Sequence, residues 1–333
     1  MVPSMIRLAL LGFGNVGRAF ARYLLKSRAD EEFSISAVAD VTGGLLLRDC
    51  DDIRRPLELQ DQAGTVADWR DLGTFLDIPD YIHSLKNAGI AVLIECLPTN
   101  PADGQPALSL LLQALEQRLH VVTVNKGPIV HGYRLLIETA ERSGAKLRYS
   151  GTTGVLPPAE VRGCHVLEIQ GILNGTTNYI LTEMQERALS FEQALARAQE
   201  QGIAEPNPAL DVQGWDTACK LLILANEWMD ARAALDDVLR IGIGSATEEL
   251  VAVARAAGRS VRFIGRARPW EGRIRLSVAP KIVRRESVFH TIRGTSKGAL
   301  FRTREKGEIF AGGVSGREAI AQTILDDVKE ITR

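Results

Sequence analysis

Short runs of apolar residues alternate with amphipathic segments through the first 150 residues. The runs at 6–11, 33–39 and 91–96 are almost wholly apolar, and a fourth run, at 120–124, follows a leucine-rich helical segment. Continuous apolar runs of this length are typical of strands buried on both faces, and helical segments between them are typical of parallel crossovers. The pattern predicts the α/β fold class, with a parallel sheet covered by helices.

A glycine-rich turn follows the first apolar run directly, and a helical pattern begins at once after it. In this strand–turn–helix context the first glycine permits a tight turn. The second lets a pyrophosphate approach the backbone, and the third lets the helix pack on the strand. Asp40 ends the next run about 20 residues further on, where a carboxylate would bind the ribose hydroxyls. These features predict a doubly wound Rossmann domain that binds a nicotinamide dinucleotide through Gly12, Phe13, Gly14, Asn15, Val16, Gly17 and Asp40.

Asp40 also bears on the choice of coenzyme. A carboxylate at this position favours NAD, because it repels the 2′-phosphate of NADP. Arg48, Arg54 and Arg55 could fold back onto that phosphate, so NADP remains an open alternative. The expected cofactor is NAD or NADP, with a preference for NAD.

Two further strand ends supply polar groups to the same edge of the predicted sheet. Pro98, Thr99 and Asn100 follow the run at 91–96, and Lys126 follows the run at 120–124. Ligands of doubly wound sheets bind beyond the carboxyl ends of the strands, so we expect these residues to contact the cofactor. The alternative interpretation of Lys126 is a solvated loop lysine. Gly312, in a glycine turn before the last helical segment, is a further candidate for cofactor binding.

The stretch 202–222 gathers four ionisable side chains around the start of a predicted helix. Asp216 and Lys220 are four residues apart and therefore share one face of that helix, opposite its apolar stripe. An ordinary surface ion pair is the alternative interpretation. Two prolines stiffen the preceding loop, which carries Glu205 and Asp211. A lysine held among carboxylates in a partly dry cleft is a candidate acid/base group.

Length and charge restrict the class of protein. A chain of 333 residues predicts two domains, and a formal net charge of −1 gives no electrostatic reason to expect nucleic acid or a membrane as partner. The four cysteines are scattered without metal-ligand spacing, so we expect free thiols, no transition-metal site and a cytoplasmic protein. We place a dinucleotide-binding domain at 1–150 and a second, α+β domain at 151–305, with the segment 306–333 docking back on the first.

Six motifs together resemble the homoserine dehydrogenase family over nearly the whole chain. They are LGFGNVG at 11–17, LPTN at 97–100, VVTVNKGP at 121–128, GTTGVLPP at 151–158, GILNGTTNYIL at 171–181 and GIAEPNPALDVQGWDTACKLLILA at 202–225. The resemblance implies the reversible reduction of L-aspartate 4-semialdehyde to L-homoserine with NAD(P)H, on the route to threonine, methionine and isoleucine. It also implies a Rossmann domain joined to a substrate-binding, catalytic and dimerisation domain at 151–305, and a homodimer.

The same resemblance implies roles for individual residues. Lys126 and Lys220 correspond to the two active-site lysines of the family, and Asp216 corresponds to the aspartate beside the second lysine. Glu205 matches the carboxylate that holds the substrate amino group, and Asp211 matches a further substrate-binding aspartate. The substrate is also expected to contact the fifth motif at Asn174, Gly175 and Thr176.

Two stretches depart from the family pattern. Ser150 and Gly151 stand where many members carry a glutamate that helps to bind a monovalent cation, so a sodium or potassium site is left open. The tail reads GGVSG, followed by Ala319-Ile320-Ala321 in place of the family's Thr-Ala. The chain stops at Arg333, so we expect a short form without a C-terminal ACT-type domain, and weak or absent inhibition by threonine.

The mechanistic hypothesis requires the amines of Lys126 and Lys220 to share one site. Lys220 would stabilise and protonate the alkoxide that forms when hydride reaches the aldehyde carbon, and Lys126 would add a second positive charge. One alternative is another aldehyde-converting Rossmann oxidoreductase with a nucleophilic cysteine, for which Cys96 is the candidate. The other is a non-catalytic protein that senses dinucleotides with the same fold.

Overall fold

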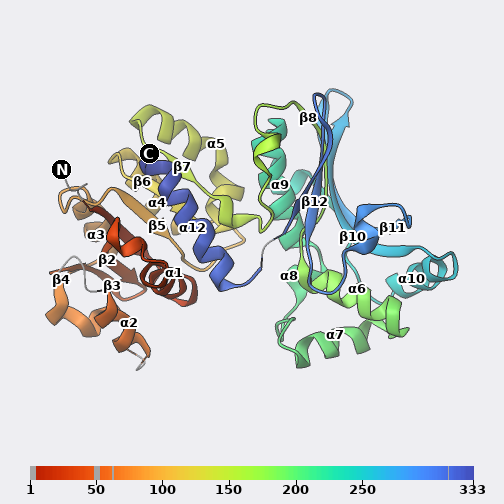
Figure 1. Ribbon diagram of the computed structural model, residues 1–333, viewed down its shortest axis with the longest axis horizontal. Helices are drawn as coiled ribbons and strands as arrows, with labels where there is room; N and C mark the ends of the chain where they lie inside the picture. The colour runs from red at the N-terminus through yellow and green to blue at the C-terminus, as the bar shows by residue number, and fades with distance from the viewer. Residues whose placement is uncertain (1–4, 49–52, 62–63, 314) are drawn as a thin grey trace. The chain divides into compact units, whose positions relative to one another are not determined.

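The computed structural model describes residues 5–48, 53–61, 64–313 and 315–333. The chain divides into two compact units (Figure 1). The first unit comprises Met1–Thr152 together with Ser315–Arg333, and the second comprises Thr153–Val314.

The first unit contains a seven-stranded sheet in which the glycine loop and the expected cofactor residues follow strand ends. In spatial order its strands are β4 (Gly73–Leu76), β3 (Gly43–Leu47), β2 (Phe33–Asp40), β1 (Ile6–Leu11), β5 (Val92–Glu95), β6 (His120–Thr123) and β7 (Leu147–Arg148). The five strands from β2 to β7 are parallel, as the apolar runs predict. Strands β3 and β4, at one side of the sheet, pair antiparallel and were not expected from the sequence.

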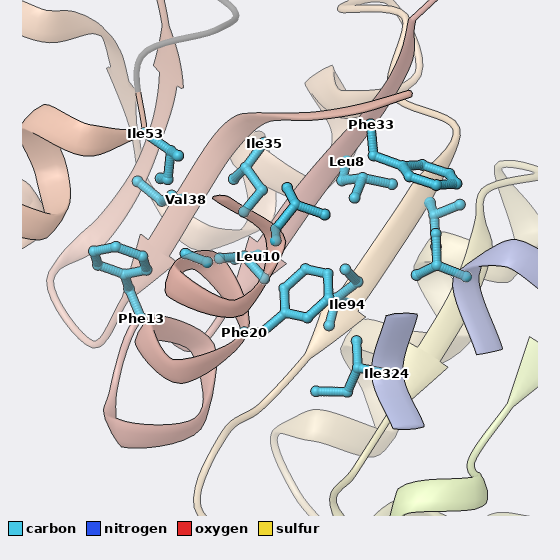
Figure 2. Close-up of a cluster of buried hydrophobic side chains, with 14 of the residues drawn as sticks. Leu8, Leu10, Phe13, Phe20, Phe33, Ile35, Val38, Ile53, Ile94 and Ile324 are labelled. Carbon is cyan, nitrogen blue, oxygen red and sulfur yellow. The ribbon is translucent and has the colours of Figure 1, made fainter. Parts of the chain in front are cut away.

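Helices pack on this sheet and close its core. They are α1 (Asn15–Lys26), α2 (Arg54–Asp61), α3 (Ile78–Leu85), α4 (Ala107–Glu116), α5 (Lys126–Ser143) and α12 (Arg317–Thr332). Helix α12, from the end of the chain, packs beside α1. Figure 2 shows Ile324 of α12 near Phe20 of α1 and Ile94 of β5, all within one buried apolar cluster. Helix α12 is therefore part of the core of the first unit.

The second unit is built on a six-stranded sheet. In spatial order its strands are β13 (Gly307–Gly312), β12 (Gly298–Thr303), β8 (Val166–Ile172), β10 (Ser260–Trp270), β11 (Arg273–Val283) and β9 (Val238–Arg240). All of these pairs are antiparallel except β11 with β9. Its helices are α6 (Gly175–Arg187), α7 (Phe191–Glu200), α8 (Ala209–Val212), α9 (Trp215–Met229), α10 (Thr247–Ala256) and α11 (Val288–Thr291).

The long helix α9 packs on strands β8, β10 and β11 and presents its polar face near the end of β8. Gly265 of β10 permits this approach, because a Cβ there would lie 3.3 Å from the Thr217 side chain of α9. Short 3-10 helices complete the fold at Ala29–Glu31, Val66–Leu72, Ser150–Thr152, Ala159–Val161 and Leu235–Asp237.

The boundary expected at residue 306 requires correction. Strand β13 covers Gly307–Gly312 and pairs with β12 across six residue pairs, so this segment belongs to the second unit. Only Ser315–Arg333 returns to the first unit. Among the described residues no helix is both long enough and apolar enough to cross a membrane.

Candidate active site

The glycine loop between β1 and α1 has the geometry that a pyrophosphate requires. Gly12 has a φ of +106°, and a Cβ there would lie 2.7 Å from the Cys96 carbonyl carbon. A Cβ at Gly17 would lie 2.3 Å from the Gly12 oxygen, so only glycine allows α1 to begin this close to the strand. A Cβ at Gly14, the N-cap of α1, would meet no heavy atom within 4 Å. The space above Gly14 and the start of the 12-residue helix fit an anionic group.

Phe13, Asn15 and Val16 complete the loop without pointing to a ligand. Phe13 is buried and packs edge-on against Trp69 at 6.0 Å between ring centroids. The Asn15 side chain accepts a hydrogen bond from Arg18 (3.1 Å). Val16 packs on the buried cluster of the first unit. Their side chains stabilise the loop, so a cofactor contact from them would come from the main chain.

Asp40 ends β2, in the position that the ribose contact requires, but its carboxylate is already hydrogen-bonded. One oxygen accepts from the Thr42 N–H (2.8 Å) and the Thr42 hydroxyl, and the other accepts from the Val66 N–H (2.9 Å). These bonds fix the carboxylate while leaving it lone pairs, because an ionised carboxylate has about four acceptor positions. The ribose contact of Asp40 stays a prediction.

The arginines that could bind a 2′-phosphate are partly engaged elsewhere. Arg54 pairs with Asp30 (3.3 Å), and Arg55 pairs with Glu58 (3.4 Å). Both pairs are exposed and therefore weak, so neither fixes the coenzyme.

Asn100 shapes the loop after β5. Its amide donates to the Asp103 carboxylate (2.9 Å) and to the Gln105 carbonyl (3.0 Å), and its oxygen accepts from the Ala102 N–H (3.0 Å). The side chain is therefore used inside the loop. Pro98 and Thr99, just before it, are exposed at the carboxyl end of the strand. Of the three, Pro98 and Thr99 are the better placed for a ligand.

A buried carboxylate, which sequence analysis did not identify, joins the ends of β5 and β6. Glu95 is completely buried and accepts hydrogen bonds from the Leu97 N–H (2.7 Å), the Asn125 amide (3.1 Å) and the Thr123 hydroxyl. Burial raises the pKa of Glu95 from 4.5 to about 7, and these hydrogen bonds oppose that rise. The signal in the sequence was a single acid at the end of the apolar run AVLIEC.

Glu95 indirectly positions Lys126. Asn125, which donates to Glu95, is the N-cap of α5, and its side-chain oxygen accepts from the Gly127 N–H (3.0 Å). Lys126 is the first residue of that helix and is half-buried. Hydrogen bonds thus join the strand end to the cap, and Lys126 follows the cap directly in the chain.

Cys96 is unsuited to nucleophilic chemistry. Burial, with the neighbouring Glu95 carboxylate, raises the pKa of the thiol far above its ordinary value. Because only the thiolate is a strong nucleophile, this cysteine stays unreactive near neutral pH. The alternative that relied on Cys96 loses its chemical basis.

In the second unit, the end of β8 and the starts of α6, α8 and α9 bring four side chains together. Lys220 Nζ donates to Asp216 Oδ2 (2.6 Å) and to the Leu173 carbonyl (3.0 Å). The Asn174 amide donates to Asp216 Oδ2 (2.9 Å) and to Asp211 Oδ1 (2.6 Å). We call these four residues the Lys220 cluster: Asn174, Asp211, Asp216 and Lys220.

The Lys220–Asp216 pair is not an ordinary surface pair. Its side chains are 12% and 16% exposed, and the ammonium also contacts a main-chain carbonyl. Such partly dry pairs are screened less than exposed ones. These contacts favour a lysine held in a partly buried site over an ordinary surface ion pair.

The cluster carries an excess of negative charge at Asp211. Burial, and then the neighbouring Asp216 carboxylate, raise the pKa of Asp211 above its ordinary value, although the bond from Asn174 and the Lys220 charge oppose the rise. Two carboxylates therefore share one ammonium and one amide. A cationic group of a ligand would relieve this repulsion.

Of the remaining residues expected to bind the substrate, Thr176 contacts the Lys220 cluster, whereas Gly175 and Glu205 make other contacts. Gly175 lies where a Cβ would come 2.8 Å from the Thr295 oxygen, so close packing accounts for this glycine. Thr176 donates to the Ile203 carbonyl (3.1 Å) and also hydrogen-bonds Asp211. Glu205, two residues after Ile203, has an exposed side chain, and its main-chain oxygen accepts from Gln199 (3.2 Å).

Local geometry gives little support for a cofactor contact at Gly312 or for a monovalent cation site near Ser150 and Gly151. Gly312 is an exposed residue at the end of β13, and a Cβ there would meet nothing within 4 Å. Ser150 and Gly151 form part of a 3-10 helix, where the Ser150 N–H donates to Asp327 (3.2 Å). Among the described residues no group of three histidine, cysteine or acidic side chains is arranged to hold a metal ion.

Two family models match the chain in succession. Residues 12–150 match a model described as homoserine dehydrogenase, NAD binding domain, and residues 155–328 match a model described as homoserine dehydrogenase. The chain is 34% identical to a homoserine dehydrogenase of Methanocaldococcus jannaschii, over 97% of each protein. It is 33% identical to an NAD(+)-dependent homoserine dehydrogenase of Pseudomonas canavaninivorans, over 98% of this chain and 96% of that one.

Solved structures show the same architecture. A putative homoserine dehydrogenase from Archaeoglobus fulgidus superimposes with a TM-score of 0.84 at 32% identity, covering 98% of this chain and 99% of that one. A hyperthermophilic archaeal homoserine dehydrogenase in complex with NADPH has a TM-score of 0.78, with 98% of each chain covered. At 22% identity the second likeness bears on the fold alone.

Proposed function

The chain belongs to the homoserine dehydrogenase family, and from this premise we propose that the Lys220 cluster is its substrate site. The protein is an oxidoreductase with an NAD-binding domain. The enzymes of its family interconvert L-homoserine and L-aspartate 4-semialdehyde. The observation that carries the proposal is the hydrogen-bonded network of Lys220, Asp216, Asn174 and Asp211.

Lys220 is the proposed proton donor to the substrate oxygen. A lysine ammonium has three N–H donors, and the contacts to Asp216 and Leu173 use two of them. The third remains for an alkoxide oxygen, whose negative charge it would stabilise before transferring the proton. Asp216 holds the ammonium in place. In the direction of homoserine oxidation, the neutral amine of Lys220 would receive the hydroxyl proton.

Asp211 is the proposed contact for the substrate ammonium. The raised pKa of this carboxyl, caused by burial and by Asp216, means that its negative charge is poorly compensated in the free protein. An amino-acid ammonium beside it would supply the missing positive charge. The Asn174 amide orients the carboxylate by donating a hydrogen bond to it. A role for Glu205 in the same contact stays a prediction.

The dinucleotide, when bound, supplies the hydride acceptor or donor. The chain's contribution is the loop of Gly12, Gly14 and Gly17, whose open space above Gly14 and helix N-terminus suit the pyrophosphate. A contact of Lys126 with the reacting oxygen is part of the proposal, because the cap at Asn125 holds this lysine at a strand end of the first unit.

Several finer points belong to the same proposal. We expect a preference for NAD because Asp40 ends β2, and one relative is named as NAD(+)-dependent. A monovalent cation remains an open expectation, as do a homodimer and a cytoplasmic location.

The decisive test compares Lys220→Ala and Lys220→Arg with the unaltered chain in homoserine-dependent reduction of NAD⁺ and NADP⁺. We expect the alanine variant to lose turnover by about 10² to 10⁴, since it removes the proton donor. Dinucleotide binding, followed by fluorescence, should be unchanged. Lys281→Ala, an exposed lysine of the same unit, is the control.

Near-normal turnover in Lys220→Ala would remove Lys220 from the mechanism. Loss of dinucleotide binding together with turnover would show that the variant acts on folding instead. A chain that binds dinucleotides but never reduces them with homoserine would favour the non-catalytic alternative.

A further inference from the structure

The second unit contains a cavity of about 620 Å³ whose wall is dominated by arginines. It lies where the last turns of α6 and α10 meet the first residues of β10 and the segment around α11. None of the Lys220 cluster lines it. The volume is in the range of small-molecule sites. Five guanidinium groups contribute to the wall, from Arg255, Arg259, Arg262, Arg285 and Arg293.

The positive charge of this cavity is poorly balanced. Of the described residues that line it, Glu186 alone carries a carboxylate, and it pairs with Arg293 (3.0 Å). Arg255 and Arg259 are exposed and have no carboxylate partner within the described part of the chain. The whole chain has 40 basic and 41 acidic residues, so the excess is a local arrangement.

The deepest guanidinium is buried without a counter-ion in contact. Arg262 is 2% exposed, and it donates to the carbonyls of Val261 (2.9 Å), Phe289 (3.1 Å) and His290 (3.2 Å). Burial and the nearby Arg293 lower the pKa of Arg262 to about 10, although Glu186 opposes this. Burying a charge is costly unless it is paired, so an anion in the cavity would stabilise this site.

Hydrogen bonds make the wall of the cavity rigid. Gln185 of α6 donates to the Arg259 carbonyl (2.7 Å) and accepts from the Val261 N–H (2.9 Å), which joins α6 to β10. Ser260 is hydrogen-bonded to His290 (2.9 Å).

Arg285 is fixed in the same way. It donates to the Gly258 carbonyl (2.8 Å), and a Cβ at Gly258 would lie 2.7 Å from its guanidinium. Only a glycine at position 258 lets this side chain lie across the backbone. Groups held in place in this way lose little entropy when a ligand binds.

We propose that this cavity is a second ligand site, which binds a small polyanion bearing phosphate or several carboxylate groups. Guanidinium groups donate paired hydrogen bonds that match the oxygens of both chemical groups. Arg255 and Arg259 supply the exposed contacts, and Arg262 supplies positive potential from the floor. The site is independent of the reaction at the Lys220 cluster.

The test is calorimetric titration of the full chain with pyrophosphate and, separately, with citrate. Sodium chloride at matched ionic strength is the reference, and saturating NAD⁺ occupies the glycine loop of the first unit. We expect saturable binding of at least one probe. Pyrophosphate alone would assign a phosphorylated ligand, and citrate alone would assign a polycarboxylate.

Three variants locate the binding. Arg255→Gln with Arg259→Gln should weaken it by about tenfold or more, because two charge-assisted contacts are lost. Glu186→Gln should tighten it by about threefold to tenfold, because the opposing carboxylate is removed. Arg273→Gln, at an exposed arginine that begins β11, should leave it within about twofold.

The proposal is overturned if neither probe binds saturably, or if the double variant binds as tightly as the unaltered chain. It is also overturned if Arg273→Gln weakens binding as much as the double variant, since a diffuse surface potential would then explain the effect. Homoserine-dependent turnover without added anion should stay normal in all three variants, which confirms that they fold.

Discussion

The buried carboxylate of Glu95 gives the sharpest quantitative prediction. Its pKa in the folded protein is about 7, against an ordinary value of 4.5. The folded state therefore holds this proton more tightly than the unfolded state does. The resulting stabilisation is fully present below about pH 4.5 and is lost as the pH rises through about 7. The full difference of about 2.5 pKa units corresponds to about 3 kcal/mol.

Glu95→Gln removes this titration while keeping the size of the side chain. Between about pH 5.5 and about pH 8.5, the titration of Glu95 lowers the free energy of unfolding of the unaltered chain by about 2 kcal/mol. The variant has no carboxyl at this position and does not show this loss. The free energy of unfolding of the variant, relative to the unaltered chain, should therefore rise by about 2 kcal/mol over this interval. Amide hydrogen exchange in β1 and β5 measures this quantity for the first unit itself.

Glu138→Gln is the matched control, because Glu138 lies on α5 of the same unit and its side chain is 58% exposed. Its stability difference from the unaltered chain should be constant over the same pH interval. A constant difference for Glu95→Gln as well would refute the reasoning. It would mean that the hydrogen bonds from Leu97, Thr123 and Asn125 offset the whole cost of burial.

Two other predictions concern the polar cluster and the glycine loop. Asn174→Ala should lower kcat/KM by about 10-fold to 100-fold, because the bonds to Asp211 and Asp216 are lost, and should cost about 1 kcal/mol through loss of the α6 cap. Asn174→Ser keeps a capping oxygen without adding a third carboxylate beside Asp211 and Asp216. Steady-state kinetics should therefore show the same loss while thermal unfolding shows less; equal unfolding losses in both variants would contradict the cap. Gly17→Ala should destabilise the first unit by about 1–3 kcal/mol and raise the KM for the dinucleotide, because the new methyl overlaps the Gly12 oxygen. Chemical denaturation and dinucleotide titration check this, and unchanged values for both would show that α1 can shift without cost.

Local sequence patterns were sufficient for the parallel strands and for the glycine loop. Apolar runs of six or seven residues are typical of strands buried on both faces, and the three glycines form a recognisable spacing within 12–17. Their structural reasons differ, because Gly17 is restricted by the nearby Gly12 oxygen, whereas Gly12 is restricted by Cys96, just after β5. The pairing of Asp216 with Lys220 was also predictable, because it is set by helical spacing. Strands β3 and β4 had no such local signal, since β3 depends on pairing with β2, and β4 depends on pairing with β3.

Only the tertiary structure decided how distant segments meet. It brought Asn174, from the end of β8, between Asp211 and Asp216, some 40 residues later in the chain, which turns an i,i+4 pair into a four-residue network. It buried Glu95 completely, which raises the pKa of this carboxyl, although the hydrogen bonds from Thr123 and Asn125 oppose the rise. It also gathered five arginines from four segments around one cavity. Spacing along the chain fixes local contacts, whereas burial and charge balance depend on everything that folds against a residue.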